Sequence, residues 1–280
     1  MTVKVHAPAK INLALDVVGK LENGYHLLEM IMQTIDLYDR VSVKEAKETS
    51  LICNVESVPT DESNICIKAW QKIKEKYNLP GGVKIEIDKN IPVAAGMAGG
   101  STNGAATILA VNKEFDLGMT FDEMKAIGVT LGADVPYCIQ QGTALAEGIG
   151  DKLTELIRCP KIYVLAVNAG FPVSTVQVYK NLVWNQVEHH PDVKAMIKAI
   201  EIQDAAGVIE NLGNVLETSA FKLFPELAVT KARIADLGLA ALMSGSGGTM
   251  LGLTEDLELA EYALKKLKDE FPFAGVFATK

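Results

Sequence analysis

The sequence PVAAGMAGGST, residues 92–102, joins an expected strand to an expected helix and carries the strongest fold signal in the chain. Its glycines let backbone N–H groups approach an anion without a Cβ atom in the way. A helix that starts here adds unpaired amides and a partial positive charge at its N-terminus. The segment therefore predicts a phosphate cradle, although it matches neither the P-loop pattern nor G-x-G-x-x-G. The alternative is a tightly packed helix start in which Ser101 serves as a cap.

Strand and helix patterns come in blocks on both sides of this segment. In the first half we expect strands over residues 3–18, 26–43, 83–88 and 143–148, with a turn at 22–24. Helices are expected over 61–77, in the small-residue run that includes Ala105 and Asn112, and from a capping box of Thr120 and Glu123 to Gly132.

The second half predicts a buried strand over 161–170, then helices over 175–182, 191–201, 203–211, 214–222 and 225–236, and finally strand, glycine loop, strand, helix and strand. Blocks of this kind, without strict alternation, favour an α+β fold. The segment 148–160 is the candidate boundary, which gives predicted domains over 1–155 and 156–280.

The amino-acid composition excludes several classes of protein. Of 280 residues, 49% are apolar and 22% are charged, the balance of an ordinary globular enzyme rather than a disordered or collagen-like chain. No apolar run approaches the roughly 20 residues of a membrane span, and the N-terminus lacks a signal-peptide core, so a cytoplasmic protein is expected. The net charge of −8 and the absence of basic runs argue against a nucleic-acid partner. Four scattered cysteines without a C-x-x-C pair are expected to be buried free thiols.

A second glycine cluster, SGSGGT at residues 244–249, lies between two apolar stretches. Taken alone, it is typical of a flexible hairpin turn, with a ligand loop as the alternative. Two glycine loops in one chain favour an anion site shared between the two expected domains.

Polar residues in the first expected strand share one face. Lys10 and Asn12 alternate with Ile11 and Leu13, and Asp16 has the same period-two position. For Lys10, a functional role competes with a side chain that simply extends to water. For Asp134, in the segment Gly132-Ala133-Asp134-Val135-Pro136, a functional role competes with that of a turn or cap aspartate. Asp16 is therefore the alternative to Asp134 as the functionally important carboxylate of the chain.

His189 and His190 are expected in a solvated loop, and no function is assigned to them.

Five motifs occur in the chain in a characteristic order: Pro8-Ala9-Lys10-Ile11-Asn12-Leu13, Gly24-Tyr25-His26-Leu27-Leu28, Pro92-x-x-Ala95-Gly96-Met97-Ala98-Gly99-Gly100-Ser101-Thr102, Gly132-Ala133-Asp134-Val135-Pro136-Tyr137 and Ser244-Gly245-Ser246-Gly247. In this order they resemble the GHMP kinase superfamily, from residue 3 to about 253. The resemblance implies an N-terminal half like domain 2 of ribosomal protein S5, a ferredoxin-like C-terminal half, and an active site in the cleft between them.

The resemblance also implies an activity. The Pro-Ala-Lys-x-Asn and Gly-Tyr-His elements favour the member of the superfamily that uses ATP and Mg²⁺ to phosphorylate the 2-hydroxyl of a methylerythritol linked to cytidine diphosphate, in the non-mevalonate isoprenoid pathway. The partner is therefore a small-molecule substrate. One alternative is a kinase for homoserine, mevalonate or a sugar. The other is a catalytically silent module that contacts RNA, against which the net charge of −8 argues.

By the same resemblance, Asp134 is the catalytic aspartate and Lys10 is the lysine beside the reacting hydroxyl. The residues implied for nucleotide binding are Asn64, Lys89, Pro92, Ala95, Gly96, Met97, Ala98, Gly99, Gly100, Ser101 and Thr102, with Ser101 also a metal ligand. Those implied for the acceptor are Asn12, Tyr25, His26, Thr175, Tyr179, Gly245 and Ser246. The rings of Tyr25 and Tyr179 would enclose the cytosine, and His26 would contact its polar edge.

Some assignments have competing explanations. Thr175 and Tyr179 lie four residues apart on one helix face. Without the resemblance, an exposed cap and a half-buried core tyrosine would be the preferred explanation for them. Gly248 stands where the family commonly has proline, which predicts a less rigid loop. Thr102-Asn103 replaces a frequent Ser-Asp pair, and an amide at 103 would bind Mg²⁺ more weakly than a carboxylate. The full set of metal ligands and the oligomeric state stay open.

Overall fold

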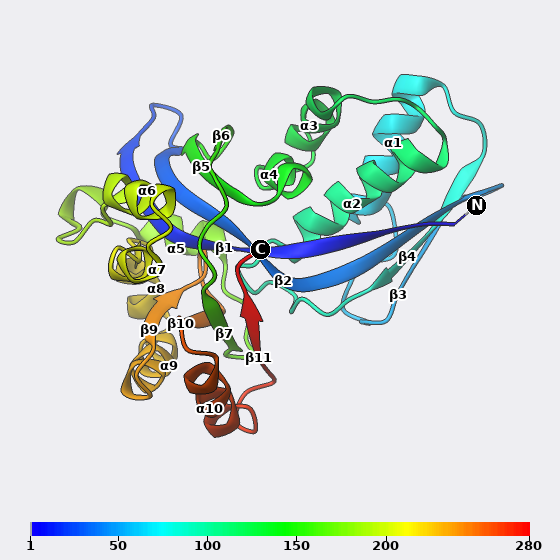
Figure 1. The fold of residues 1–280 in the computed structure, drawn as a ribbon. Coiled ribbons are helices and arrows are strands. Elements are labelled where there is room, and N and C mark those ends of the chain that lie inside the picture. The colour runs from blue at the N-terminus through cyan, green and yellow to red at the C-terminus, as the bar shows by residue number, and fades with distance from the viewer. Residues whose placement is uncertain (1) are drawn as a thin grey trace. The chain divides into compact units, whose positions relative to one another are not determined.

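The computed structural model describes residues 2–280, and the chain divides into two compact units (Figure 1). Unit 1 comprises Met1–Ala9, Leu37–Val93 and Ala98–Gln141, and unit 2 comprises Lys10–Asp36, Ala94–Met97 and Gly142–Lys280. Two long strands, β1 (Val3–Lys20) and β2 (His26–Ala46), contribute residues to both. The predicted division of the chain between residues 155 and 156 stays a prediction.

Unit 1 contains a sheet in the order β3, β4, β2 and β1. The second part of β2 pairs antiparallel with β4 (Gly82–Asp88), which pairs parallel with β3 (Ser50–Cys53). Alternation gives the sheet two faces: Val41, Val43 and Ile85 are fully buried, whereas Arg40 and Glu86 line an open face. One face of the sheet, which carries polar residues, is therefore exposed to water, and the other face, which carries apolar residues, packs into the core.

Four helices complete unit 1: α1 (Ile65–Tyr77), α2 (Gly99–Glu114), α3 (Phe121–Val129) and α4 (Val135–Gln140). Trp70 of α1 is buried and stacks on Phe115 with ring centroids 5.3 Å apart, while its indole N–H donates to Thr49 Oγ1. The alanines and glycines of α2 allow α1 to approach closely, since a Cβ atom at Gly104 would stand 3.0 Å from an Ile65 side-chain carbon.

Unit 2 contains the second part of β1 and the first part of β2. Strand β5 (Thr143–Gly148) pairs antiparallel with Leu28–Gln33 of β2, and β6 (Lys152–Glu155) pairs with β5. The two-residue strand β8 (Gly213–Asn214) lies parallel to β1 at Ala14 and Leu15.

A second sheet in unit 2 is antiparallel throughout, in the order β11, β7, β10 and β9. Its strands are β7 (Tyr163–Asn168), β9 (Ala240–Met243), β10 (Thr249–Thr254) and β11 (Phe273–Ala278). Helices α9 (Pro225–Asp236) and α10 (Leu257–Leu267) lie against it (Figure 1). Their side chains Ile234 and Leu267 are buried. The helices of this unit are α5 (Thr175–Asn181), α6 (Val193–Glu201), α7 (Ala205–Glu210), α8 (Glu217–Leu223), α9 (Pro225–Asp236) and α10 (Leu257–Leu267), with a 3₁₀ turn η1 (Trp184–Gln186).

Most expected elements are confirmed, including the capping box of Thr120 and Glu123 and the run of helices after residue 175. Several are corrected. The first helix begins at Ile65 rather than at Asp61, and α3 ends at Val129, before Gly132. The short elements β3, α4, β6 and β8 were not expected, and β6 lies in the segment predicted as a boundary. Within residues 2–280, no helix has both the length and the apolar character needed to cross a bilayer.

Candidate functional site

In unit 1, the predicted phosphate cradle is the start of α2. Ala98 occupies the N-cap position with φ = +56°, and no side chain of this residue caps the helix. A Cβ atom at Gly100 would meet nothing within 4 Å, so open space lies beside the first turn. The amides of an uncapped first turn are donors for an anion, and the helix dipole favours negative charge there. This local geometry fits a phosphate group.

Three polar residues follow in α2. Ser101 is half-buried and near Gly132, whose Cβ position lies 4.0 Å from Ser101 Oγ. Thr102 is 1% exposed, and its hydroxyl has no hydrogen-bond partner among residues 2–280. Asn103 is buried and its amide donates to Asp39 Oδ2 over 2.8 Å. The side chain at position 103 therefore serves an internal hydrogen bond here.

Lys89, predicted to line the nucleotide pocket, is buried at the same place. Its ammonium forms an ion pair with Asp39, and a Cβ atom at Gly99 would stand 2.7 Å from Lys89 Nζ. The backbone of Lys89 is held on both sides by Asn54, which accepts the Lys89 N–H over 2.6 Å and donates to its carbonyl oxygen over 3.2 Å. A fixed cation therefore lies against the first residue of α2.

Asn64, the other residue predicted for the nucleotide pocket, is the N-cap of α1. Its Oδ1 accepts the Cys66 N–H over 2.8 Å, and its Nδ2 donates to Pro59 O over 2.6 Å. Both ends of the amide thus stabilise the helix start and the preceding loop, and the role of Asn64 toward a nucleotide stays a prediction. Burial raises the pKa of the adjacent Cys66 thiol to about 12, which makes it an inert core residue.

Asp134 lies at the N-cap position of α4, a helix that the sequence did not reveal. The Asp134 carbonyl accepts the Cys138 N–H over 3.0 Å, whereas its side chain makes no capping hydrogen bond. Pro136 lies in the first turn, where a proline fixes φ without losing a helical hydrogen bond. The residue is half-buried. The Asp134 carboxylate therefore does not serve as the cap of α4.

In unit 2, Lys10 and Asn12 are buried together on β1. Lys10 is 6% exposed and Asn12 is 1% exposed, so the alternative in which Lys10 extends to water is wrong. The Lys10 ammonium donates to Asn12 Oδ1 over 3.0 Å, and its backbone N–H donates to Met97 O over 3.2 Å. The lysine is held in one place by its own strand and by the preceding part of the glycine segment.

The two glycine clusters meet inside unit 2. Loop 244–248 joins β9 to β10, so the hairpin alternative is correct, but the loop also packs on Ala94–Met97. Ser244 Oγ donates to Gly96 O over 3.1 Å. Gly248 has φ = +88°, a value that proline does not adopt, so glycine is required for this loop conformation. The two clusters are thus in contact, and the anion site expected from them stays a prediction.

Two polar residues, the buried Asn214 and the half-buried Glu217, hold the start of loop 244–248 in place, and neither stood out in the sequence. Asn214 donates to Met243 O over 2.8 Å and to Gly245 O over 2.7 Å. Glu217 accepts the Met243 N–H over 2.8 Å and pairs with Lys231 Nζ over 2.6 Å. Asn214 and Glu217 lie 26 to 31 residues before their backbone partners, so no local sequence pattern could reveal these contacts.

Three predicted acceptor residues lie near the turn between β1 and β2 and on α5. The rings of His26 and Tyr179 are 5.4 Å apart and inclined by 35°, while Tyr25 is 60% exposed. Nε2 of His26 is buried and has no hydrogen-bond partner among residues 2–280. Burial and, next, the charge of Lys20 lower the pKa of His26 from its ordinary value of 6.5, so the imidazole is neutral at pH 7.

Thr175 and Ser246 are joined directly. Their hydroxyl oxygens lie 2.7 Å apart, which links the start of α5 to loop 244–248. The cap of α5 is Ser174 rather than Thr175, so the cap alternative for Thr175 is wrong, whereas Tyr179 is half-buried as the core alternative expected. Predicted acceptor residues from two segments are therefore in contact within unit 2.

His190, expected in a solvated loop without a role, contacts the carboxylate of Asp16. Its Nδ1 lies 2.6 Å from Oδ1 of Asp16, which also accepts the Val17 N–H over 2.7 Å. Asp16 is 6% exposed. The pKa of nearby Glu29 is raised by burial first and by the charge of Asp16 next. Asp16 is thus occupied in holding the segment before α6 against β1.

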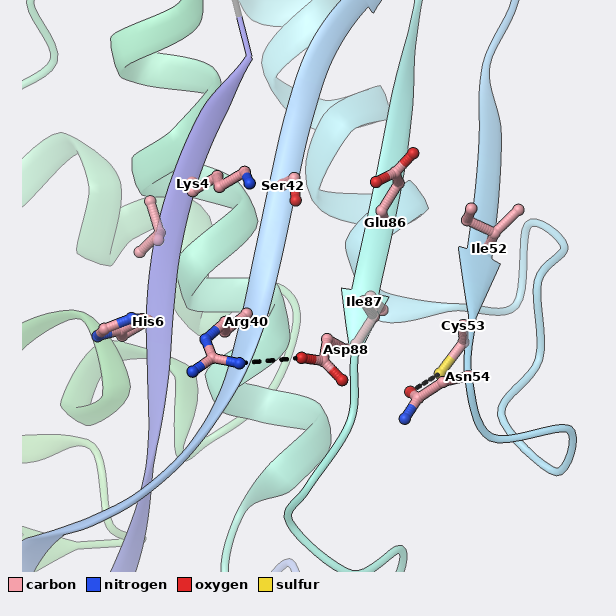
Figure 2. A pocket seen from close by; sticks show the side chains of 11 residues that line it. Lys4, His6, Arg40, Ser42, Ile52, Cys53, Asn54, Glu86, Ile87 and Asp88 are labelled. Carbon is pink, nitrogen blue, oxygen red and sulfur yellow. Dashed lines mark hydrogen bonds and ion pairs between the residues drawn. The ribbon is translucent and has the colours of Figure 1, made fainter.

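A cavity of about 780 Å³ lies over the open face of the unit 1 sheet. Figure 2 shows Arg40 paired with Asp88 in its centre, with Lys4 and Glu86 on neighbouring strands. None of the predicted site residues lines it. The Arg40–Asp88 pair is half-exposed on both sides, which is typical of a solvated sheet face.

Comparison with known proteins agrees with this arrangement. The family model for the N-terminal domain of GHMP kinases matches residues 64–142, and the model for the C-terminal domain of GHMP kinases matches residues 196–272. Together they cover more than half of the chain. The chain belongs to the GHMP kinase family. The matched ranges include α2 with its glycine start and the β9–β10 loop of this kinase.

Relatives of this GHMP kinase extend over its whole length. It is 43% identical to the 4-diphosphocytidyl-2-C-methyl-D-erythritol kinase of Clostridium perfringens, covering 99% of this chain and 98% of the relative, and 42% identical to that of Clostridium beijerinckii, covering 99% of each. A crystal structure of 4-(cytidine 5'-diphospho)-2C-methyl-D-erythritol kinase matches with a TM-score of 0.85 and 31% identity over 99% of both chains. A homoserine kinase from Cytophaga hutchinsonii matches with a TM-score of 0.75 at 18% identity over 100% of this chain and 94% of its own, a likeness of fold.

No preformed metal cage is evident in this kinase. Across residues 2–280, no three His, Cys, Asp or Glu side chains gather in a way that would hold an ion. Mg²⁺ in kinases is held largely by substrate phosphates with one or two side chains, so such a cage is not required. Ser101 as a metal ligand and Mg²⁺ itself stay predictions.

Proposed function

We propose that this chain transfers the γ-phosphoryl group of ATP to the 2-hydroxyl of 4-diphosphocytidyl-2-C-methyl-D-erythritol, in the cytoplasm. The observation that carries the proposal is the 43% identity over 99% of the chain to a kinase of that name. Homoserine and mevalonate kinases of the same fold are 16–18% identical, a level at which the fold is shared and the acceptor is not implied.

ATP is assigned to the start of α2. The uncapped first turn, the open space beside Gly100 and the unpartnered hydroxyl of Thr102 are features that a polyanion would use. The segment Ala95 to Thr102 would hold the phosphates, with Lys89 beside it and Ser101 toward the metal. Mg²⁺, when bound, would neutralise charge on the phosphate oxygens.

The cytidine end is assigned to Tyr25, His26 and Tyr179. A neutral imidazole has one donor and one acceptor nitrogen, which suits the amide-like edge of cytosine. The buried Nε2 of His26 lacks a partner, and an unsatisfied buried nitrogen is a group that ligand binding stabilises. Thr175, Gly245 and Ser246 are proposed to contact the remainder of the acceptor, since the Thr175–Ser246 contact joins their segments.

The chemical step is assigned to Lys10 and Asp134. Phosphoryl transfer depends mainly on positioning and on neutralising charge, because its transition state is loose. The Lys10 ammonium, held by Asn12, would stabilise negative charge that develops on the attacking oxygen. The Asp134 carboxylate would orient the hydroxyl and accept its proton. Asn12 would keep the lysine aimed at that oxygen.

A coupled assay of ADP release tests the proposed function. The purified chain is supplied with ATP, Mg²⁺ and one acceptor at a time: the cytidine-linked methylerythritol, homoserine, mevalonate or galactose. We expect ADP release with the cytidine-linked acceptor alone. Equal or faster release with another acceptor would overturn the assignment of substrate, and no release with any acceptor would overturn the assignment as a kinase.

A further inference from the structure

Two ion pairs lie at the end of the β2–β4 ladder, one on each face of the unit 1 sheet. Arg40 is opposite Asp88, and these side chains pair on the open face, where each is about half exposed (Figure 2). Asp39, the preceding residue of β2, and Lys89, the first residue after β4, pair on the other face, where their side chains are 0% and 5% exposed. On the open face β2 supplies the cation, whereas on the buried face it supplies the anion. The exposed pair is therefore a suitable control for substitutions in the buried pair.

The buried carboxylate has more partners than Lys89. Asp39 Oδ1 accepts the N–H groups of Asn90 and Ile91 over 2.7 and 2.8 Å. Asp39 Oδ2 accepts the Lys89 ammonium and, over 2.8 Å, the Asn103 side-chain amide. Four donors occupy both oxygens, close to the capacity of an ionised carboxylate. One side chain therefore ties together β2, the turn after β4 and the second turn of α2.

The position of Lys89 explains why a carboxylate is needed. Its ammonium lies beside Gly99, at the positive end of the α2 dipole, where a cation is electrostatically unfavourable. Its side chain is also almost fully removed from water, which is costly for an unpaired charge. Asp39 opposes both effects. Without it, the ammonium would be expected to move toward solvent and to release the start of α2.

We propose that Asp39 is a positioning residue for nucleotide binding: it holds Lys89, the turn at Asn90 and Ile91, and Asn103 so that the start of α2 is preformed for the phosphates of ATP. The inference rests on the proposed function in one respect, that the anion bound at α2 is ATP. Asp39 is itself fully buried and acts only through these partners.

The test compares Asp39→Asn with Asp88→Asn. In Asp39→Asn the shape is kept, but an amide cannot accept from all four donors, and Lys89 loses its compensating charge. Isothermal titration measures the Kd of Mg·ATP and, separately, of CDP as a probe of the acceptor pocket. We expect Asp39→Asn to raise the Kd of ATP about tenfold or more and to leave the Kd of CDP unchanged, since preorganisation is lost at one site. Asp88→Asn should change neither.

Several outcomes distinguish a positioning role from a purely structural one. A folded Asp39→Asn variant with wild-type ATP affinity would overturn the proposal, as would an equal loss of CDP affinity. If Asp39→Asn does not fold, Asp39→Asn combined with Lys89→Met removes the uncompensated charge. Because Asp39 also holds the turn at Asn90 and Ile91 and the side chain of Asn103, this double variant should bind ATP more weakly than Lys89→Met alone, and equal ATP affinity of the two would contradict the proposal. Wild-type protein that fails to bind ATP would instead overturn the proposed function.

Discussion

The carbonyl oxygen of Ser244 occupies the space that a side chain at Gly96 would need. A Cβ atom at Gly96 would also stand 2.9 Å from Gly247 O, and the residue has φ = +71°, in the left-handed region. The two glycine loops of unit 2 are therefore in backbone contact, and this contact exists only because residue 96 has no side chain.

The first prediction concerns this contact. Gly96→Ala should lower the free energy of unfolding by at least about 1–3 kcal/mol, since it adds left-handed backbone strain to a clash with fixed carbonyls. Thermal and urea unfolding measure the change. Gly100→Ala is the matched control, because its Cβ would meet nothing within 4 Å, and it should unfold like the wild type or slightly later. Equal stability of Gly96→Ala and wild type would contradict the loop contact.

The second prediction concerns Asp134. Asp134→Ala should reduce kcat by on the order of 10² to 10⁴ and leave the Kd of ATP within about twofold, because the carboxylate acts on the acceptor hydroxyl. Asp134→Asn separates the two parts of that role: an amide can orient the hydroxyl but cannot take its proton. The exposed Asp236→Ala serves as the control. Near-native turnover by Asp134→Ala would exclude Asp134 as the catalytic carboxylate.

The third prediction concerns Lys10. Lys10→Ala should lower kcat by about 10² or more, since the lost charge stabilises the transition state rather than the bound substrate. Lys4→Ala, an exposed lysine on the same strand, should behave as the wild type in steady-state kinetics. A change in KM with kcat preserved would assign Lys10 to substrate binding alone.

The fourth prediction concerns pH. Because burial and Lys20 lower the pKa of His26, the imidazole stays neutral as pH falls through 6.5 and becomes charged only below its folded value. If neutral His26 binds the cytosine, the KM for the cytidine-linked acceptor should stay constant to below pH 6.5 and then rise. Lys20→Met should move the midpoint upward, because it removes a charge that opposes protonation. NMR titration of His26 in both proteins checks the shift, and an unchanged midpoint in Lys20→Met would contradict it.

Local chemistry predicted the parts of the fold that depend on residues three or four apart. The capping box of Thr120 and Glu123 is an example, as are the small residues that make α2. The start of α1 shows the limit. Asp61 has the chemistry of a cap, but its carboxylate accepts the Ser63 N–H over 2.9 Å and forms a turn instead, which leaves Asn64 to cap the helix. Helix α4 has six residues, too few for apolar periodicity to reveal it.

The functional residues likewise divide into those that local motifs predicted and those whose partners are distant in the sequence. The motifs gave Lys10, Gly96 and Ser246, which the structure brings into defined contacts with their neighbours. Asp39 was missed because its partners lie 50 to 64 residues further along the chain, where no spacing rule applies. His190 was missed for the same reason, since Asp16 is 174 residues away from it. Tertiary contacts of this kind carry no local sequence signal.

The position of the transferred phosphoryl group tests the central claim most directly. Product formed from ATP and the cytidine-linked methylerythritol is isolated, and its proton-coupled ³¹P NMR spectrum is recorded. Phosphorylation of the 2-hydroxyl, on a carbon that bears a methyl group and no hydrogen, predicts one new monoester signal without splitting by a proton on the attached carbon. A split monoester signal would place the phosphate on another hydroxyl, and the absence of a new signal would show that this acceptor is not the substrate.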